Sequence, residues 1–140
     1  MAFEVGLVFD QQGKTIYWFG GRSSSSIPDT RSLWDILWEN RDRLGGVAHT
    51  HPWDGAAAPS MTDLTTFDAI ERGLGAHLLW PVVTFTEVAY VVHNPLFNPG
   101  NVYKAGPLTF EIEGIPQWVK AGPLTFEIEG IEELRERSRK

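Results

Sequence analysis

The chain has 140 residues, of which 42% are hydrophobic and 12% aromatic, and a net charge of −6. This composition predicts a single domain with its own core, and no run of residues is long and apolar enough to cross a membrane. With 12 basic against 18 acidic residues, nucleic-acid binding is not expected. There is no cysteine, so any metal ion must be held by His and carboxylate side chains. The missing cysteine and the absence of a signal-peptide pattern at the amino terminus favour a cytoplasmic protein.

Apolar periodicity predicts the secondary structure in chain order. Strands are predicted over residues 3–9, 15–19, 47–51, 78–84 and 88–92, and helices from a cap at Asp29 or Thr30 to Leu44 and over residues 60–72. Gly45-Gly46 is predicted to end the first helix, and Gly73 with Gly75 to end the second. This order of elements predicts an α/β (α+β) fold, in which one domain has a mixed β-sheet flanked by helices.

The last part of the chain contains a tandem duplication. Residues 104–115 recur identically as residues 120–131, so we divide the chain into a domain of residues 1–103 and a tail of residues 104–140. Each copy alternates apolar and polar residues, which is typical of a half-buried strand. We expect one copy to pack on the domain and the other to be spare, so that deletion of residues 120–140 changes stability little. In the alternative, one copy covers a sheet edge or pairs with a partner strand. A short, frayed helix is predicted after Ile131.

The strongest functional pattern lies between His49 and Asp63. His49 and His51 are one residue apart in a predicted strand, so their side chains project from the same side. Asp63 follows in the next predicted helix, three residues after Ser60. Two His and one carboxylate are three protein ligands, which leave the fourth position of a tetrahedral zinc ion open, as in catalytic zinc sites.

The same residues have other interpretations. Ser60 and Asp63 resemble a helix capping box, and we expect capping and metal binding to compete for the Asp63 carboxylate. A His-x-His pair also occurs in cupins and amidohydrolases, but no later His falls at a cupin-like spacing and the chain is too short for an amidohydrolase barrel. His77 and His93 lie outside the motif and are expected to make local hydrogen bonds. Asp54 fits a turn before a glycine.

The spacing His49-x-His51-Pro52, seven residues, then Ser60-x-x-Asp63 resembles the signature of the JAMM (MPN+, Mov34/PAD-1) metalloproteases. The form with proline directly before the serine is most similar to the prokaryotic members. The upstream segment Phe3-Glu4-Val5-Gly6-Leu7-Val8-Phe9 resembles the strand that carries a glutamate in that family, with Glu4 in the glutamate position. The resemblance covers about residues 3–93.

The resemblance implies the JAMM/MPN, cytidine-deaminase-like architecture and a zinc metalloprotease. His49, His51 and Asp63 would hold Zn²⁺, Ser60 would stabilise the tetrahedral intermediate, and Glu4 would act as general base and acid. The implied substrate is a peptide or isopeptide bond at the C-terminus of a ubiquitin-like or sulfur-carrier protein. Two alternatives remain open, which are a non-catalytic MPN-type scaffold module and a metal hydrolase of a small amide. Trp53 either lines the substrate cleft or packs on the body of the domain.

Overall fold

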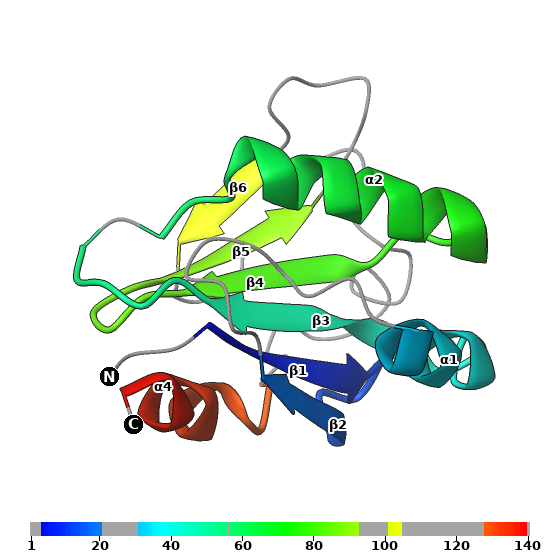
Figure 1. The fold of residues 1–140 in the computed structure, drawn as a ribbon, viewed down its shortest axis with the longest axis horizontal. Coiled ribbons are helices and arrows are strands. Elements are labelled where there is room, and N and C mark those ends of the chain that lie inside the picture. The colour runs from blue at the N-terminus through cyan, green and yellow to red at the C-terminus, as the bar shows by residue number, and fades with distance from the viewer. Residues whose placement is uncertain (1–3, 21–30, 56, 93–100, 105–127, 140) are drawn as a thin grey trace.

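The computed structural model describes residues 4–20, 31–55, 57–92, 101–104 and 128–139 (Figure 1). The elements are β1 Val5–Asp10, β2 Thr15–Gly20, α1 Arg31–Glu39, β3 Leu44–Thr50, α2 Met61–Leu74, β4 Leu79–Val83, β5 Val88–Val92, β6 Asn101–Lys104 and α4 Ile131–Arg139. They confirm the predicted fold class, a mixed β-sheet with helices packed on it. The first copy of the repeat after Lys104, residues 120–127 of the second, and His93 lie outside the described residues. None of the helices in the described ranges has the length and apolar character needed to cross a bilayer.

The six strands form one sheet in the order β2-β1-β3-β4-β5-β6, which can be followed in Figure 1. Strands β3 and β4 are parallel, and the other neighbouring pairs are antiparallel. Two parallel strands need a crossover between them, and α2 provides it. The C-terminal end of β3 and the N-terminal end of α2 are therefore joined by the loop that follows β3. This is the edge of the sheet at which α/β proteins commonly place their functional residues.

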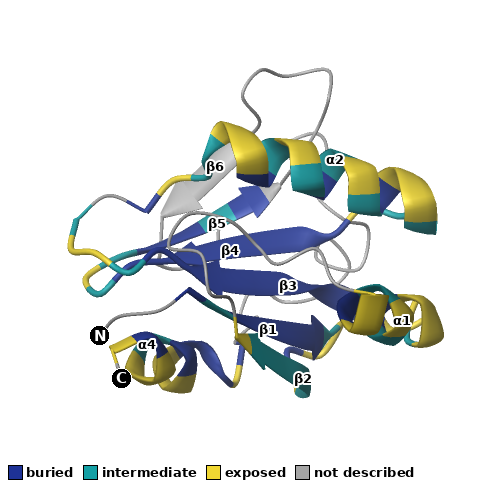
Figure 2. Cartoon of the chain, viewed as in Figure 1, coloured by how far each residue is buried: buried dark blue, intermediate teal, exposed yellow. Residues whose placement is uncertain are grey.

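Side chains alternate between two apolar layers, one on each face of the sheet. On one face, Val8 and Val47 pack with Leu33 and Leu37 of α1 and with Phe67 of α2. The opposite face is covered by the C-terminal segment, in a cluster that includes the following residues: Leu7, Phe9, Ala48, Leu79, Val83, Ile128, Ile131 and Leu134. Figure 2 shows β1, β3 and β4 as buried strands between helices whose outer sides are exposed.

Of the glycines predicted to end the two helices, Gly75 does so, whereas Gly45 and Gly46 lie in β3, beyond the end of α1. Helix α1 ends at Glu39, and Asn40 follows it by donating from its backbone and side-chain nitrogens to the carbonyl of Ile36. Gly46 instead lies inside β3, where a Cβ atom would meet the carbonyl oxygen of Leu79 at 1.9 Å, so close strand packing explains this glycine. In α2 the helix continues to Leu74, and Gly75, with φ of 69°, forms the left-handed cap.

The C-terminal helix is not frayed. Ile131 and Leu134 of α4 and Ile128 before it are 8%, 0% and 4% exposed in the core. The backbone amide of Glu129 donates to the carbonyl oxygen of Gly13 in the β1–β2 turn at 2.9 Å. The sequence-based expectation that residues 120–140 are dispensable does not account for this packing. The end of the second repeat and the helix after it complete one apolar face of the sheet, so we now expect their deletion to destabilise the protein. Strand β6 was also not predicted from the sequence.

Candidate metal centre

The three predicted ligands meet at the junction of β3 and α2. Nε2 of His49 lies 3.1 Å from Nε2 of His51, and Oδ2 of Asp63 lies 3.0 Å from each of them. All three side chains are buried, with exposures of 0%, 2% and 0%. Among the described residues, this is the group of His and carboxylate side chains whose donor atoms are close enough together to hold a metal ion.

The donor atoms fit a small divalent cation. Three ligands about 2.0–2.1 Å from a tetrahedral zinc ion lie roughly 3.3 Å apart, close to the separations seen here. Two imidazoles and one carboxylate suit zinc and several other first-row metals. Within the described part of the chain, Nδ1 of His49, Nδ1 of His51 and Oδ1 of Asp63 are buried without a hydrogen-bond partner. Buried polar atoms are normally satisfied, so the cluster is costly as a purely structural feature.

The protonation states of the cluster also suit a metal. Burial alone raises the pKa of Asp63, but its hydrogen bonds with His49 and His51 outweigh burial and hold the pKa well below its usual range. Burial lowers the pKa of the His49 ring, and this effect outweighs the opposing influence of Asp63. An ionised carboxylate beside a neutral imidazole is the state in which both groups can ligate a cation.

Ser60 and Asp63 form a complete capping box at the start of α2. The backbone amide of Asp63 donates to Oγ of Ser60 at 3.0 Å, and the amide of Ser60 donates to Oδ2 of Asp63 at 2.9 Å. Oδ2 accepts the cap hydrogen bond while facing both histidines, so capping does not turn the carboxylate away from the cluster; whether capping and metal binding compete for it stays a prediction. A carboxylate oxygen has two lone pairs, so Oδ2 can accept the hydrogen bond from the Ser60 amide with one and face the histidines with the other. Oγ of Ser60 accepts the hydrogen bond from the Asp63 amide, so the hydroxyl proton of Ser60 is still available for donation to another acceptor.

The register of β1 and β3 places Glu4 on the side of the histidines. Gly6 lies directly opposite His49 in the antiparallel pair, and the amide of Val5 donates to Oγ1 of Thr50 at 2.9 Å. Continuation of this register brings Glu4 opposite His51. Residues two apart share a face, so Glu4 lies on the same face of the sheet as both imidazoles. Glu4 is 1% exposed, unlike a glutamate that is simply solvated.

Trp53 lies in the loop after β3. Its ring centroid is 4.5 Å from that of His51, and the side chain is still 43% exposed. The ring therefore packs beside the cluster and also presents a face to solvent, while its place in a substrate cleft stays a prediction. Asp54 is exposed and is not part of the cluster.

Sequence reasoning missed the residues that hold this loop in place. Oγ1 of Thr84 donates to the carbonyl oxygen of Gly55 at 2.7 Å, and the amide of Gly55 donates to Oγ1 of Thr86 at 2.8 Å. Both threonines lie in the turn between β4 and β5, about 30 residues further along the chain, and no local pattern marks them.

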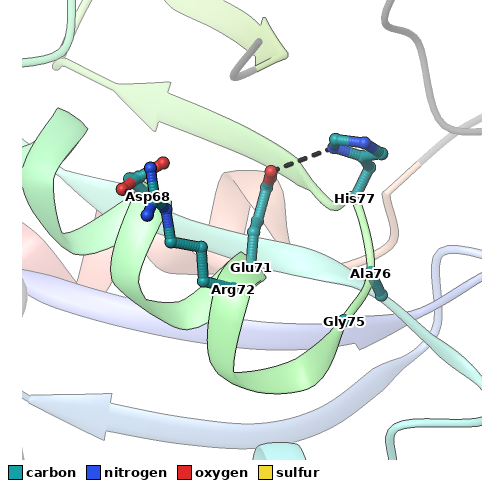
Figure 3. A pocket seen from close by; sticks show the side chains of 6 residues that line it. All are labelled: Asp68, Glu71, Arg72, Gly75, Ala76 and His77. Atoms are coloured by element: carbon teal, nitrogen blue, oxygen red, sulfur yellow. Dashed lines mark hydrogen bonds and ion pairs between the residues drawn. The ribbon is translucent and has the colours of Figure 1, made fainter. Parts of the chain in front are cut away.

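A hollow of about 180 Å³ lies at the opposite end of α2 from the cluster and is lined by Asp68, Glu71, Arg72, Gly75, Ala76 and His77 (Figure 3). Oε1 of Glu71 lies 3.1 Å from Nδ1 of His77, which confirms the expected local hydrogen bond of this histidine. Oε2 of Glu71 accepts from the amide of Leu78 and from the indole of Trp80 at 3.1 and 2.7 Å. These bonds tie the end of α2 to β4, so Glu71 has a structural role.

Comparison of the chain with protein-family models, with curated proteins and with solved structures finds no match in any of the three. The fold class is therefore inferred from this chain's own sequence and structure. The same holds for the buried cluster of His49, His51 and Asp63, which could hold a metal ion.

Proposed function

We propose that the chain is a zinc-dependent metallopeptidase of the JAMM type, which hydrolyses a peptide or isopeptide bond at the C-terminus of a ubiquitin-like or sulfur-carrier protein. The observation that carries the proposal is the convergence of one donor atom each from His49, His51 and Asp63, with separations of 3.0–3.1 Å in a buried site. The residues that resemble the JAMM signature are the same ones that the fold brings together.

Each residue has a distinct chemical role in this proposal. When bound, a zinc ion with three protein ligands supplies a water of near-neutral pKa and polarises the substrate carbonyl. Glu4 takes a proton from the attacking water as the water oxygen bonds to the carbonyl carbon. As the carbon–nitrogen bond breaks, Glu4 returns that proton to the leaving amine. The Ser60 hydroxyl donates to the carbonyl oxygen, which becomes negative during the attack.

In this proposal an extended substrate chain lies beside Trp53. Trp53 presents an aromatic face to solvent beside His51. A chain end made of glycines has no side chains and can approach such a face closely. We therefore propose that the tail of the ubiquitin-like or sulfur-carrier substrate, which would end in glycine, lies along this ring.

A scaffold module without metal is a weaker explanation. In such a module, an ionised Asp63 buried with two imidazoles would add no stability. Burial of polar groups that lack full hydrogen bonding lowers the stability of the fold. A metal hydrolase of a small amide would use the same ligands, so the two enzymatic functions must be separated by their substrates.

The test is incubation of the zinc-loaded protein with a panel of ubiquitin-like and sulfur-carrier fusions, followed by mass spectrometry. A cleavage product that ends at the carrier's C-terminal residue supports the proposal, provided that Glu4→Gln gives none. Cleavage of a small fluorogenic amide without cleavage of any fusion would replace the proposed substrate class. A zinc-loaded protein that cleaves neither would contradict the enzymatic function.

A further inference from the structure

The turn between β4 and β5, residues 84–87, joins the metal-site loop to the C-terminal helix. On the loop side, the amide of Phe85 donates to the carbonyl oxygen of Trp53 at 3.0 Å, and Thr84 and Thr86 bind the backbone of Gly55. The amide of Trp53 in turn donates to the carbonyl oxygen of His51 at 2.8 Å. Three hydrogen bonds therefore tie the loop beside the cluster to this distant turn.

On its other side the turn is held by α4. Nε of Arg135 donates to the carbonyl oxygen of Thr84 at 2.9 Å, and Nη2 donates to that of Glu87 at 3.4 Å. The Arg135 side chain is 14% exposed and is also paired with Glu132 through Nη1. The guanidinium of Arg139 lies 5.0 Å from the ring centre of Phe85. A planar guanidinium with several fixed donors can hold two carbonyl groups in one relative position.

Thr84 connects the two sides directly. Its carbonyl oxygen accepts from Arg135, and its hydroxyl donates to Gly55 in the loop beside the cluster. Thr84 is 1% exposed, so neither interaction is open to replacement by bulk water. Displacement of the Thr84 backbone would move the partner of Gly55 and, through Phe85, the partner of Trp53.

We propose that Arg135 is a positioning residue, which fixes the β4–β5 turn and thereby holds the Trp53 loop against the metal cluster. The C-terminal helix is then part of the architecture of the site, although it follows the duplicated segment and lies on the other face of the sheet. The role of Arg135 in holding the β4–β5 turn does not depend on any enzymatic activity. Its kinetic consequence rests on the proposed function, because a displaced Trp53 would weaken substrate binding more than it would weaken metal binding.

The test compares Arg135→Met with Arg137→Met by amide hydrogen exchange in the full chain. Arg137 is on the same helix and lies over the Trp18 ring, away from the turn, which makes it a matched control. Arg135→Met should speed exchange of the Phe85 and Gly55 amides at least about tenfold while β3 amides keep their rates, because only the local restraint is lost. Arg137→Met should leave all of these rates unchanged, and Arg135→Lys should restore protection in part.

Unchanged exchange at Phe85 and Gly55 in Arg135→Met would overturn the proposal. An equal increase in β3 amides would also overturn it, since that result means general destabilisation. On any substrate that the wild type cleaves, Arg135→Met should raise KM several-fold and keep the zinc content and kcat within about twofold. A fall in kcat without a change in KM would contradict the expected effect on substrate binding. Whether Arg135 fixes the β4–β5 turn is decided by the exchange rates.

Discussion

Asp63 accepts the backbone amide of Ser60 through Oδ2, the same oxygen that lies 3.0 Å from each histidine Nε2 atom. The hydrogen bond from the Ser60 amide therefore both caps the start of α2 and holds the Asp63 carboxylate beside the histidines. The positive end of the helix dipole also favours a negative charge in this first turn. The capping box thus orients the carboxylate that completes the cluster.

This relationship predicts different outcomes for the two capping residues. Ser60→Ala removes the acceptor for the Asp63 amide and should cost about 1 kcal/mol of stability, whereas zinc should still bind because the Ser60 backbone continues to hold Asp63. Asp63→Asn removes the ligand charge and should weaken zinc binding by more than the ~10–100-fold that loss of an outer-shell partner costs. Thermal melts and competition with a zinc chelator measure the two effects. Asp68→Asn, on the same helix, is the control and should retain zinc affinity.

Glu4→Gln should abolish hydrolysis and leave zinc bound. The substitution keeps the size of the side chain and removes the proton acceptor, and loss of a general base and acid costs roughly 10²–10⁴ in rate. The rate is measured on whichever fusion the wild type cleaves, together with zinc content. Glu39→Gln, at the exposed end of α1, serves as the control. Wild-type turnover in Glu4→Gln would exclude Glu4 as the base.

Leu134→Ala should strongly destabilise the protein. Leu134 is fully buried against the sheet, and truncation of a buried leucine to alanine costs about 2–5 kcal/mol. Glu136→Ala, exposed on the same helix, should change stability by less than about 0.5 kcal/mol. Urea unfolding of both variants measures the difference. Truncation at residue 119 should unfold the chain, and a truncated protein that melts like the full chain would show that α4 does not pack on the sheet.

Glu71 should make stability depend on pH. Burial raises the pKa of its carboxyl above the ordinary value, despite opposing hydrogen bonds from Trp80, Leu78 and His77. Between the unfolded and folded pKa values the folded state binds more protons, so the contribution is present at low pH and is lost as pH rises through the folded pKa. Melting temperatures of the wild type and Glu71→Gln, followed upward from pH 4, should therefore show a loss in the wild type that the variant lacks. Parallel curves would contradict this expectation.

All three candidate ligands could be predicted from the sequence because they lie close together in the chain. His49 and His51 share a strand face by simple alternation, and Ser60 and Asp63 lie within one helical turn. The predicted fold class follows from the order of apolar segments in the same way. These features depend on separations of a few residues, over which backbone geometry is regular.

The remaining features depend on contacts between distant segments. Gly46 looks like the end of a helix in the sequence, and only its contact with Leu79 of β4 shows that it belongs to a strand. The two copies of the repeat are identical, so the sequence could not show that Ile128 of the second copy is a core residue. The link from Arg135 to Thr84 spans 51 residues and leaves no local pattern.

The most direct test of the metal centre is the anomalous scattering of crystals grown with zinc, measured at the zinc absorption edge. We predict one peak per chain, roughly 2.0–2.2 Å from Nε2 of His49, Nε2 of His51 and Oδ2 of Asp63. No peak at this position, or a peak only at the hollow beside Glu71 and His77, would contradict the account.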